Sequence, residues 1–227
     1  APYGSGTALA FDGTDDYLRT GGSADDVGLV GESFTVEAWI RVDDLTGDNP
    51  ILGHEDRAPR FNQVLHLTTR GTTLHMGFYN SDLPGTAELE EGRWHHAAFV
   101  YDAADRQQRI YLDGQLDGTR SAEPFAGSQS EPLRIGQWGG DNYFDGALDE
   151  LRIWTEARSE ADIQAAMHQT IPTDTPGLVA SYRFDAAQTD QRLEDPFAGT
   201  TAYDLAGGRN ASFVGDPVSD PQWTESG

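Results

Sequence analysis

The sequence contains neither cysteine nor lysine. Without cysteine the chain has no disulfides and no thiolate metal sites, so its redox compartment stays open. All 15 basic residues are arginine, and 38 acidic residues bring the formal net charge to −23. Such a surface repels phosphate backbones and anionic lipid, which argues against nucleic acids and membrane surfaces as partners.

Long apolar runs are also missing. No stretch approaches the roughly 18 apolar residues of a membrane span, so we expect no membrane insertion. The start, APYGSGTALAF, lacks the basic and apolar regions of a secretory signal. An Ala-Pro start is compatible with a signal or tag that has been removed, and the sequence does not distinguish the two.

The acidity has two explanations that the sequence leaves open. A field of carboxylates is screened in concentrated salt, so the composition is compatible with a halophilic source. A GC-rich genome would also favour arginine codons over lysine codons.

What the sequence does contain is a series of short strand-like runs. Apolar residues make up 37% of the chain, enough to form a core, and 227 residues suit one all-β domain of about 200 to 250 residues. Clusters of Gly, Asp, Asn and Pro separate the runs, a spacing typical of all-β proteins. The runs are TALAF, SFTVEAWIRV, QVLHLTT, TTLHMGFY, RWHHAAFVY, QRIYLDG, PLRIGQ, ALDELRIW and GLVASYRF.

Two of these runs alternate with a period of two, which predicts one face in the core and one face outside it. The inward set is Phe34, Val36, Ala38, Ile40, Val42, Leu151 and Ile153. The outward set is Thr35, Glu37, Trp39, Arg41, Glu150, Arg152 and Trp154. We therefore expect a two-sheet sandwich whose outward charges form solvent-exposed cross-strand pairs.

One segment, residues 156–169, predicts a helix. Ser159 followed by Asp162 is typical of an N-cap with an acidic first turn. Ile163 and Met167 then share one face, and the prolines of IPTDTPG end the helix. We expect it to cover one end of the sandwich.

Six motifs follow one another over residues 8–168: ALAFDGTDDYLRT, SFTVEAWIRV, RWHHAAFVYD, QRIYLDGQ, LRIGQ and FDGALDELRIW. Together they resemble a laminin G-like domain of the concanavalin A-like lectin/glucanase superfamily, close to the pentraxins. The resemblance implies an all-β fold, a two-sheet antiparallel jelly-roll sandwich with one short helix.

The segments GLVASYRFD and TTAYDLAGGRNASFVG resemble the part that commonly precedes ALAFDG in this family, but here they follow the helix. Either they open a further repeat, or they return to the same sandwich. We favour the second reading, because a stranded tail would expose apolar residues and unpaired edges. Residues 1–227 then form a single domain, with 172–227 completing the sandwich.

The sequence offers no recognisable catalytic pair, so we predict no catalytic residues. Glucanases of this superfamily carry a Glu-x-Asp-x-x-Glu strand, and no segment here matches it. Asp149 and Glu150 are adjacent and should point to opposite faces of a strand, as should His95 and His96.

The loop WGGDNYFDG, residues 138–146, has the residue types of a calcium site. Asp141, Asn142 and Asp145 supply oxygen ligands, and its glycines allow tight turns. Pentraxins place calcium ligands after the GQ strand and on an Asp-Asn pair. Asn62 matches that Asn, but Phe61 replaces the Asp.

We therefore expect a single calcium ion on Asp141 and Asp145, completed by Glu55, Asp56 or Asn62, with an ion-free solvated loop as the alternative. A second acidic cluster, FDGTDDYL, contains Asp12, Asp15 and Asp16. It is either a further ion site or a plain hairpin turn, which Asp and Gly also favour.

Aromatic residues beside polar oxygens are typical of sugar sites, where a ring stacks on the sugar and oxygens bind its hydroxyls. Trp138, Tyr143 and Asn142 provide these groups, and Asn80 could share the rim.

The sequence thus predicts a non-catalytic carbohydrate-binding or adhesive module that binds a glycan or polysaccharide, and it leaves both a Ca²⁺-dependent and an ion-free site open. We expect it to be secreted or displayed on a cell surface, and a place within a larger multidomain protein stays open. The alternatives are a glycan-cleaving enzyme (glycoside hydrolase or lyase) with an unconventional site and a structural spacer repeat of a large surface adhesin.

Overall fold

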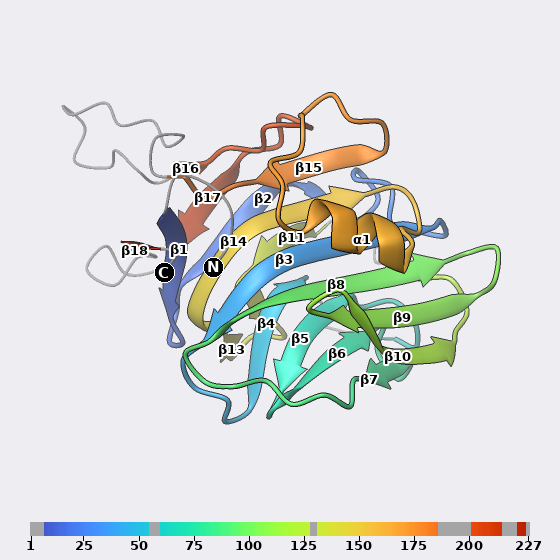
Figure 1. The fold of residues 1–227 in the computed structure, drawn as a ribbon, viewed down its shortest axis with the longest axis horizontal. Helices are drawn as coiled ribbons and strands as arrows, with labels where there is room; N and C mark the ends of the chain where they lie inside the picture. Colours follow the sequence, from blue (N-terminus) through green and yellow to red (C-terminus); the bar gives the residue numbers. More distant parts are fainter. Residues whose placement is uncertain (1–6, 55–59, 128–130, 186–200, 215–221, 226–227) are drawn as a thin grey trace.

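A computed structural model describes residues 7–54, 60–127, 131–185, 201–214 and 222–225 (Figure 1). Among them, no helix is long and apolar enough to cross a membrane. The elements in chain order are β1 (Thr7–Asp12), β2 (Tyr17–Ser23), β3 (Phe34–Val42), β4 (Asp48–Gly53), β5 (His66–Arg70), β6 (Thr73–Gly77), β7 (Asp82–Pro84), β8 (Trp94–Asp102), β9 (Gln107–Leu112), β10 (Gln115–Ser121), β11 (Pro132–Ile135), β12 (Gln137–Trp138), β13 (Asn142–Tyr143), β14 (Asp145–Trp154), α1 (Glu160–Ala166), β15 (Leu178–Tyr182), β16 (Thr201–Ala202), β17 (Ala211–Val214) and β18 (Gln222–Glu225).

Two large antiparallel sheets face each other. Sheet A has the order β10-β9-β8-β3-β14-β1-β18, and β15 also pairs with β14. Sheet B has the order β16-β17-β2-β11-β4-β5-β6-β7. At the centre of each sheet, strands distant in sequence lie side by side, as β3 with β14 and β2 with β11 do, which is the arrangement of a jelly roll. The predicted jelly-roll sandwich is confirmed.

The core lies between the two sheets, where alternation predicted it. Val36 and Ile40 of β3 and Leu151 of β14 are fully buried there. They share one cluster with Leu67 and Met76 of sheet B. Burial of these large apolar side chains, each contributing roughly 1.5–3 kcal/mol, holds the sheets together.

The residues after the helix supply strands to both sheets. In sheet A, β15 pairs with β14 and β18 pairs with β1. In sheet B, β17 pairs with β2. The Tyr182 hydroxyl also donates a 2.6 Å hydrogen bond to the carbonyl of Arg209, joining β15 to the approach of β17.

The predicted helix cap is confirmed. Ser159 is the N-cap of α1, and Ser159 and Asp162 bond reciprocally through side chain and backbone. Ile163 is fully buried against Ala98, Val100 and Tyr111 of sheet A. The helix, orange in Figure 1, therefore lies on the outer face of sheet A.

Three of the four outward charges of β3 and β14 are buried, so the expectation of surface pairs is wrong for them, whereas Arg41 is partly exposed and pairs with Asp43 at 2.9 Å. Glu37, Glu150 and Arg152 are 0%, 3% and 1% exposed. Arg152 donates to Glu150 (2.9 Å) and to the carbonyl oxygens of Ala166 (3.2 Å) and Gln169 (2.8 Å). The end of α1 and the residues after it cover these charges, which alternation within a strand does not reveal.

A β-bulge in β14 also overturns the expectation that Asp149 and Glu150 face opposite sides. Asp149 lies opposite Trp39 and Arg152 opposite Glu37, so the register shifts, and Glu150 has φ 49°. Burial, followed by the charge of Glu150, raises the pKa of Asp149 to about 9. The two acids form a closed polar cluster with Arg152 beneath the helix.

Candidate functional site

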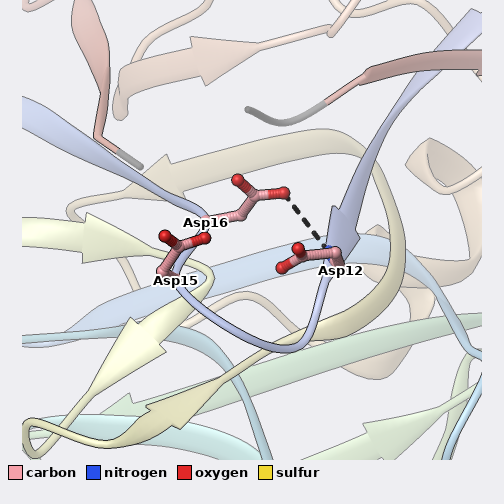
Figure 2. A group of neighbouring side chains, drawn as sticks. All are labelled: Asp12, Asp15 and Asp16. Atoms are coloured by element: carbon pink, nitrogen blue, oxygen red, sulfur yellow. Dashed lines mark hydrogen bonds between the residues drawn. The ribbon is translucent and has the colours of Figure 1, made fainter. Parts of the chain in front are cut away.

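Asp12, Asp15 and Asp16 lie at the turn between β1 and β2 (Figure 2). This turn is not a hairpin, because β1 belongs to sheet A and β2 to sheet B. The Gly13 N–H instead donates a 3.0 Å hydrogen bond to the carbonyl of Phe144, which fastens the crossing to the start of β14.

The three carboxylates converge at this crossing. One oxygen from each lies within 4.8 Å of the others. Asp16, 1% exposed, accepts a 3.3 Å hydrogen bond from the Asp12 N–H, and Asp12 accepts a 2.8 Å bond from the Thr14 N–H. The acids therefore shape the turn as well as concentrating negative charge.

Asp145 from the other predicted cluster joins this group. It lies opposite Asp12 in the β1–β14 ladder, and a Cβ added to Gly13 would lie only 3.2 Å from its carboxylate oxygen. Burial, then the charges of Asp43, Asp44 and Asp12, raises the pKa of Asp145. Asp145 thus adjoins the first cluster, whereas Asp141 lies on the neighbouring hairpin and, like Asp145, is outside the group of three whose oxygens converge. We define the acidic rim as Asp12, Asp15, Asp16, Asp141 and Asp145.

Residues 137–143 form a small hairpin of β12 and β13 beside the rim. Gly139 (φ 66°) and Gly140 (φ 88°) make its turn, and the Asn142 amide donates to the Trp138 carbonyl at 3.3 Å. Asp141 is exposed at its tip. Gly146 serves differently from expectation: it lies within β14, where a Cβ would collide with the Arg41 carbonyl.

Tyr143 connects the hairpin to the crossing between the sheets. Its ring centroid lies 6.4 Å from that of Tyr17, and the Arg134 guanidinium lies 5.1 Å from the Tyr17 centroid. Burial, then Tyr17 and the charges of Asp141 and Asp15, raises the pKa of Tyr143. The tyrosine therefore lies near acids from both loops.

Tyr17 and Arg134 were not predicted as site residues. Tyr17 directly follows Asp15 and Asp16 in FDGTDDYL, so an aromatic residue next to an acidic cluster was the available signal. Arg134 carried no such signal, because only pairing of β11 with β2 brings it there.

Trp138 points elsewhere. It contacts His66 edge-on, with ring centroids 4.5 Å apart, and lies against Gly53 of β4. Gly53 lies opposite His66 in the β4–β5 ladder, and the neighbouring pair Leu52 and Leu67 faces the core. Gly53 and His66 therefore face the outer side of sheet B. The Trp138 indole N–H is buried there and has no hydrogen-bond partner among the residues that the structure describes. Trp138 and Tyr143, predicted together, thus lie over different strands of sheet B.

The predicted asparagines lie at another pair of turns. Asn62 is 5% exposed with φ 63°, and its amide donates to the carbonyls of Glu123 and Pro124. Asn80 is exposed with φ 57° in the turn after Tyr79, whose carbonyl accepts the Asn62 N–H. Asp56 and Glu55 lie outside the described residues.

The rim has the chemistry of a hard-cation site. Ca²⁺ binds oxygens at about 2.3–2.6 Å, so ligands on opposite sides of the ion lie roughly 4.6–5.2 Å apart. One carboxylate oxygen each from Asp12, Asp15 and Asp16 lie within 4.8 Å of one another, so all three are close enough to contact one ion. Partly buried tyrosines next to these oxygens also suit a sugar ring and its hydroxyls.

Comparison with known proteins places the fold. The family model described as the concanavalin A-like lectin/glucanases superfamily, the laminin G-like group, matches residues 12–164. The sequence matches no curated protein.

Solved structures share the sandwich at low identity. A Bacteroides ovatus protein described as carbohydrate-binding has 23% identity and a TM-score of 0.74, covering 96% of this chain and 59% of its own. The carbohydrate-binding module (CBM40) of a Ruminococcus gnavus sialidase, bound to α2,3 sialyllactose, has 14% identity and a TM-score of 0.61, covering 71% and 96%. Domain 4 of a Geobacillus stearothermophilus GH43 arabinanase, in complex with arabinotriose, has 23% identity and a TM-score of 0.55, and the match covers 74% of this chain and 80% of that domain.

The chain therefore spans 59% of the length of the Bacteroides protein. At these identities the likeness concerns the fold, whereas the family model matches more than half of the sequence. The chain belongs to the laminin G-like family of the concanavalin A-like lectin/glucanases superfamily.

Proposed function

We propose that this chain is a non-catalytic carbohydrate-binding module that is secreted or displayed on the cell surface. It binds its glycan at the acidic rim, where Tyr17 and Tyr143 offer ring surfaces and the neighbouring carboxylates accept hydrogen bonds from the sugar hydroxyls. The observation that carries the proposal is the meeting of two aromatic rings and two acidic loops at one crossing between the sheets.

The relatives support a sugar ligand. The Bacteroides protein is described as carbohydrate-binding, and the sialidase module and the arabinanase domain were solved with sialyllactose and arabinotriose. One of these glycans is anionic and one is neutral. The net charge of −23 favours a neutral glycan for this chain, because an anionic one would approach a field of its own sign.

Calcium completes the proposed site. Asp12, Asp15 and Asp16 would hold the ion, with Asp145 beside them. Bound there, the cation would neutralise carboxylates that otherwise repel one another and would give sugar hydroxyls a Lewis-acidic partner. The raised pKa of Asp145 reflects that repulsion in part.

Cleavage of the glycan is the alternative function. The bulge brings Asp149 and Glu150 together, and a pair of carboxyls with one kept protonated is a hydrolase feature. Both side chains, however, are at most 3% exposed and lie under the helix. We therefore assign this pair to the interior of the protein and propose binding without cleavage.

A glycan array probed with the purified chain in millimolar Ca²⁺ and again in EDTA tests the proposal. We expect binding to at least one class of neutral glycan in Ca²⁺ and its loss in EDTA. Silence across the array would instead favour a spacer repeat, and release of shortened sugars from the bound glycan would favour the enzyme.

A further inference from the structure

A hollow lies on the outer face of sheet A, beside the end of α1. Its volume is about 530 Å³, within the roughly 300–1,000 Å³ of small-ligand sites. Trp39 of β3 and Trp94 of β8 line it, with Asp113 from the β9–β10 turn and His168 just after the helix. None of these residues belongs to the acidic rim.

The aromatic walls are held in place by the protein itself. The Trp39 indole N–H donates a 2.8 Å hydrogen bond to the Met167 carbonyl, and its ring centroid lies 5.3 Å from that of His168. Trp94 is partly exposed and has the Arg41 guanidinium 5.7 Å from its ring centroid. A ligand entering the hollow would therefore meet aromatic surfaces that lose little freedom on binding.

Asp113 gives the hollow a fixed acceptor. One of its oxygens accepts from His95 Nδ1 and the other from the His96 backbone N–H, each at 2.8 Å. Burial alone would raise the pKa of Asp113, but these hydrogen bonds outweigh it and lower the pKa. The side chain is still 45% exposed, so its remaining lone pairs face solvent.

The cations around the hollow are already paired. Arg93, 59% exposed, lies 2.6 Å from Glu90, and Arg41 lies 2.9 Å from Asp43. The Arg41 guanidinium already lies 5.7 Å from the Trp94 ring centroid, which disfavours a second cation on that ring, and the net charge of −23 disfavours an anion. An uncharged ligand with an apolar face and hydroxyls fits the hollow, because the face can pack on the aromatic walls while Asp113 accepts hydrogen bonds from the hydroxyls and Arg93 donates hydrogen bonds to them.

We propose that this hollow is a second sugar subsite, which takes one ring of a neutral glycan without calcium. Trp94 and His168 contact the ring, while Asp113 and Arg93 bind its hydroxyls. The inference rests on the proposed function for its ligand class. Strands β1, β14, β3 and β8 are consecutive in sheet A, so Trp94 lies about 14 Å across the sheet from Asp12.

The test isolates the hollow from the rim. In the Tyr143→Ala variant in EDTA, the indole N–H resonance of Trp94, identified by its loss in Trp94→Phe, is followed by NMR while arabinotriose, xylotriose or cellotriose is added. We expect a saturable shift with at least one trisaccharide and none with sialyllactose. Trp94→Ala lacks this resonance, so its binding is measured by calorimetric titration in the same background and in EDTA, and it should be about tenfold weaker.

Arg93→Ala serves as a second variant, because its exposed side chain contributes little to folding. It should weaken the same binding by several fold. A Trp94 resonance that ignores all three trisaccharides, or that responds to tetramethylammonium instead, overturns the subsite. If Trp94→Ala keeps the array binding and the Trp94 resonance of Tyr143→Ala does not shift, the subsite is overturned and the rim is not. If the resonance shifts but the array shows no calcium-dependent binding, the rim is overturned and the subsite is not.

Discussion

Asp149 is an acid that its surroundings keep neutral. It is 1% exposed, and the charges of Glu150 and Asp185 add to the effect of burial on its pKa, while Arg152 opposes them. The pKa of Asp149 is about 9 in the folded chain and near 4 in the unfolded chain. Between these two pH values the folded chain keeps the proton on Asp149, whereas the unfolded chain has released it. Stability contributed by that proton is present at low pH and is lost as pH rises toward 9.

Asp149→Asn should therefore remove the contribution of Asp149 to the pH dependence of the free energy of unfolding. It should keep the hydrogen bond from the Glu150 N–H (2.9 Å), because Asn retains the accepting oxygen. Between pH of about 7 and 9, we expect the wild-type free energy of unfolding to fall by up to about 1.4 kcal/mol per pH unit, and the variant to fall less. His96, whose pKa burial lowers to about 4, is neutral in both states there.

Urea unfolding at several pH values measures this slope. The exposed Asp174→Asn serves as the matched control and should behave as wild type. Parallel slopes for wild type and Asp149→Asn would show that Asp149 is ionised in the folded protein.

Single residues also show where sequence reasoning stops. Alternation correctly sent Leu151 inward, because a strand repeats every two residues. It failed at Asp149, which it placed on the face opposite Glu150, because an extra residue in β14 shifts the register, and it could not show that α1 buries Arg152. Both failures come from contacts between distant segments.

At the scale of elements, the strands after α1 matter most. β15 hydrogen-bonds to β14, β17 to β2 and β18 to β1, and Tyr182 and Ala211 contribute to the core. Removing all of them would expose the neighbouring strands and part of the core together. Exposed edges of this kind are templates for aggregation.

We expect a chain truncated after Thr170 to be insoluble or to lose cooperative unfolding. A chain ending at Val214, which lacks only β18, is the matched control and should fold. Circular dichroism melting and size-exclusion chromatography distinguish the two. A truncated chain that stays monomeric and melts cooperatively would assign the tail to another unit.

Element signals in the sequence differed in strength. The Ser159 cap is local, and the sequence predicted it correctly. The turn at residues 12–16 looks like a hairpin locally, and only the pairing of β1 with β14 and β2 with β11 shows that it crosses between sheets. That crossing brings Asp145 and Tyr143 to the first acidic cluster, so the sequence supplied the residues of the rim but not their meeting.

For the whole molecule, the net charge of −23 without lysine sets the response to salt. If the acidity is an adaptation to high salt, removing salt should lengthen the range of repulsion and lower the melting temperature markedly. Melting curves in low and molar NaCl measure the effect, and replacing exposed acids by Asn and Gln should remove it. Equal melting temperatures at both salt concentrations would leave codon bias as the explanation.

The central claim is that this laminin G-like domain binds a glycan at the acidic rim through calcium. Calorimetric titration of the strongest array glycan into wild type tests it, with Ca²⁺, with EDTA, and with Asp12→Asn and Asp15→Asn combined. We predict measurable affinity in Ca²⁺, loss of this calcium-dependent affinity in EDTA and in the double variant, with only the weaker binding of the second subsite left, and about tenfold weakening in Tyr143→Ala. Phe61→Ala, an exposed aromatic control, should bind as wild type. Unchanged affinity in EDTA, in the Asp12→Asn and Asp15→Asn double variant and in Tyr143→Ala would contradict the claim.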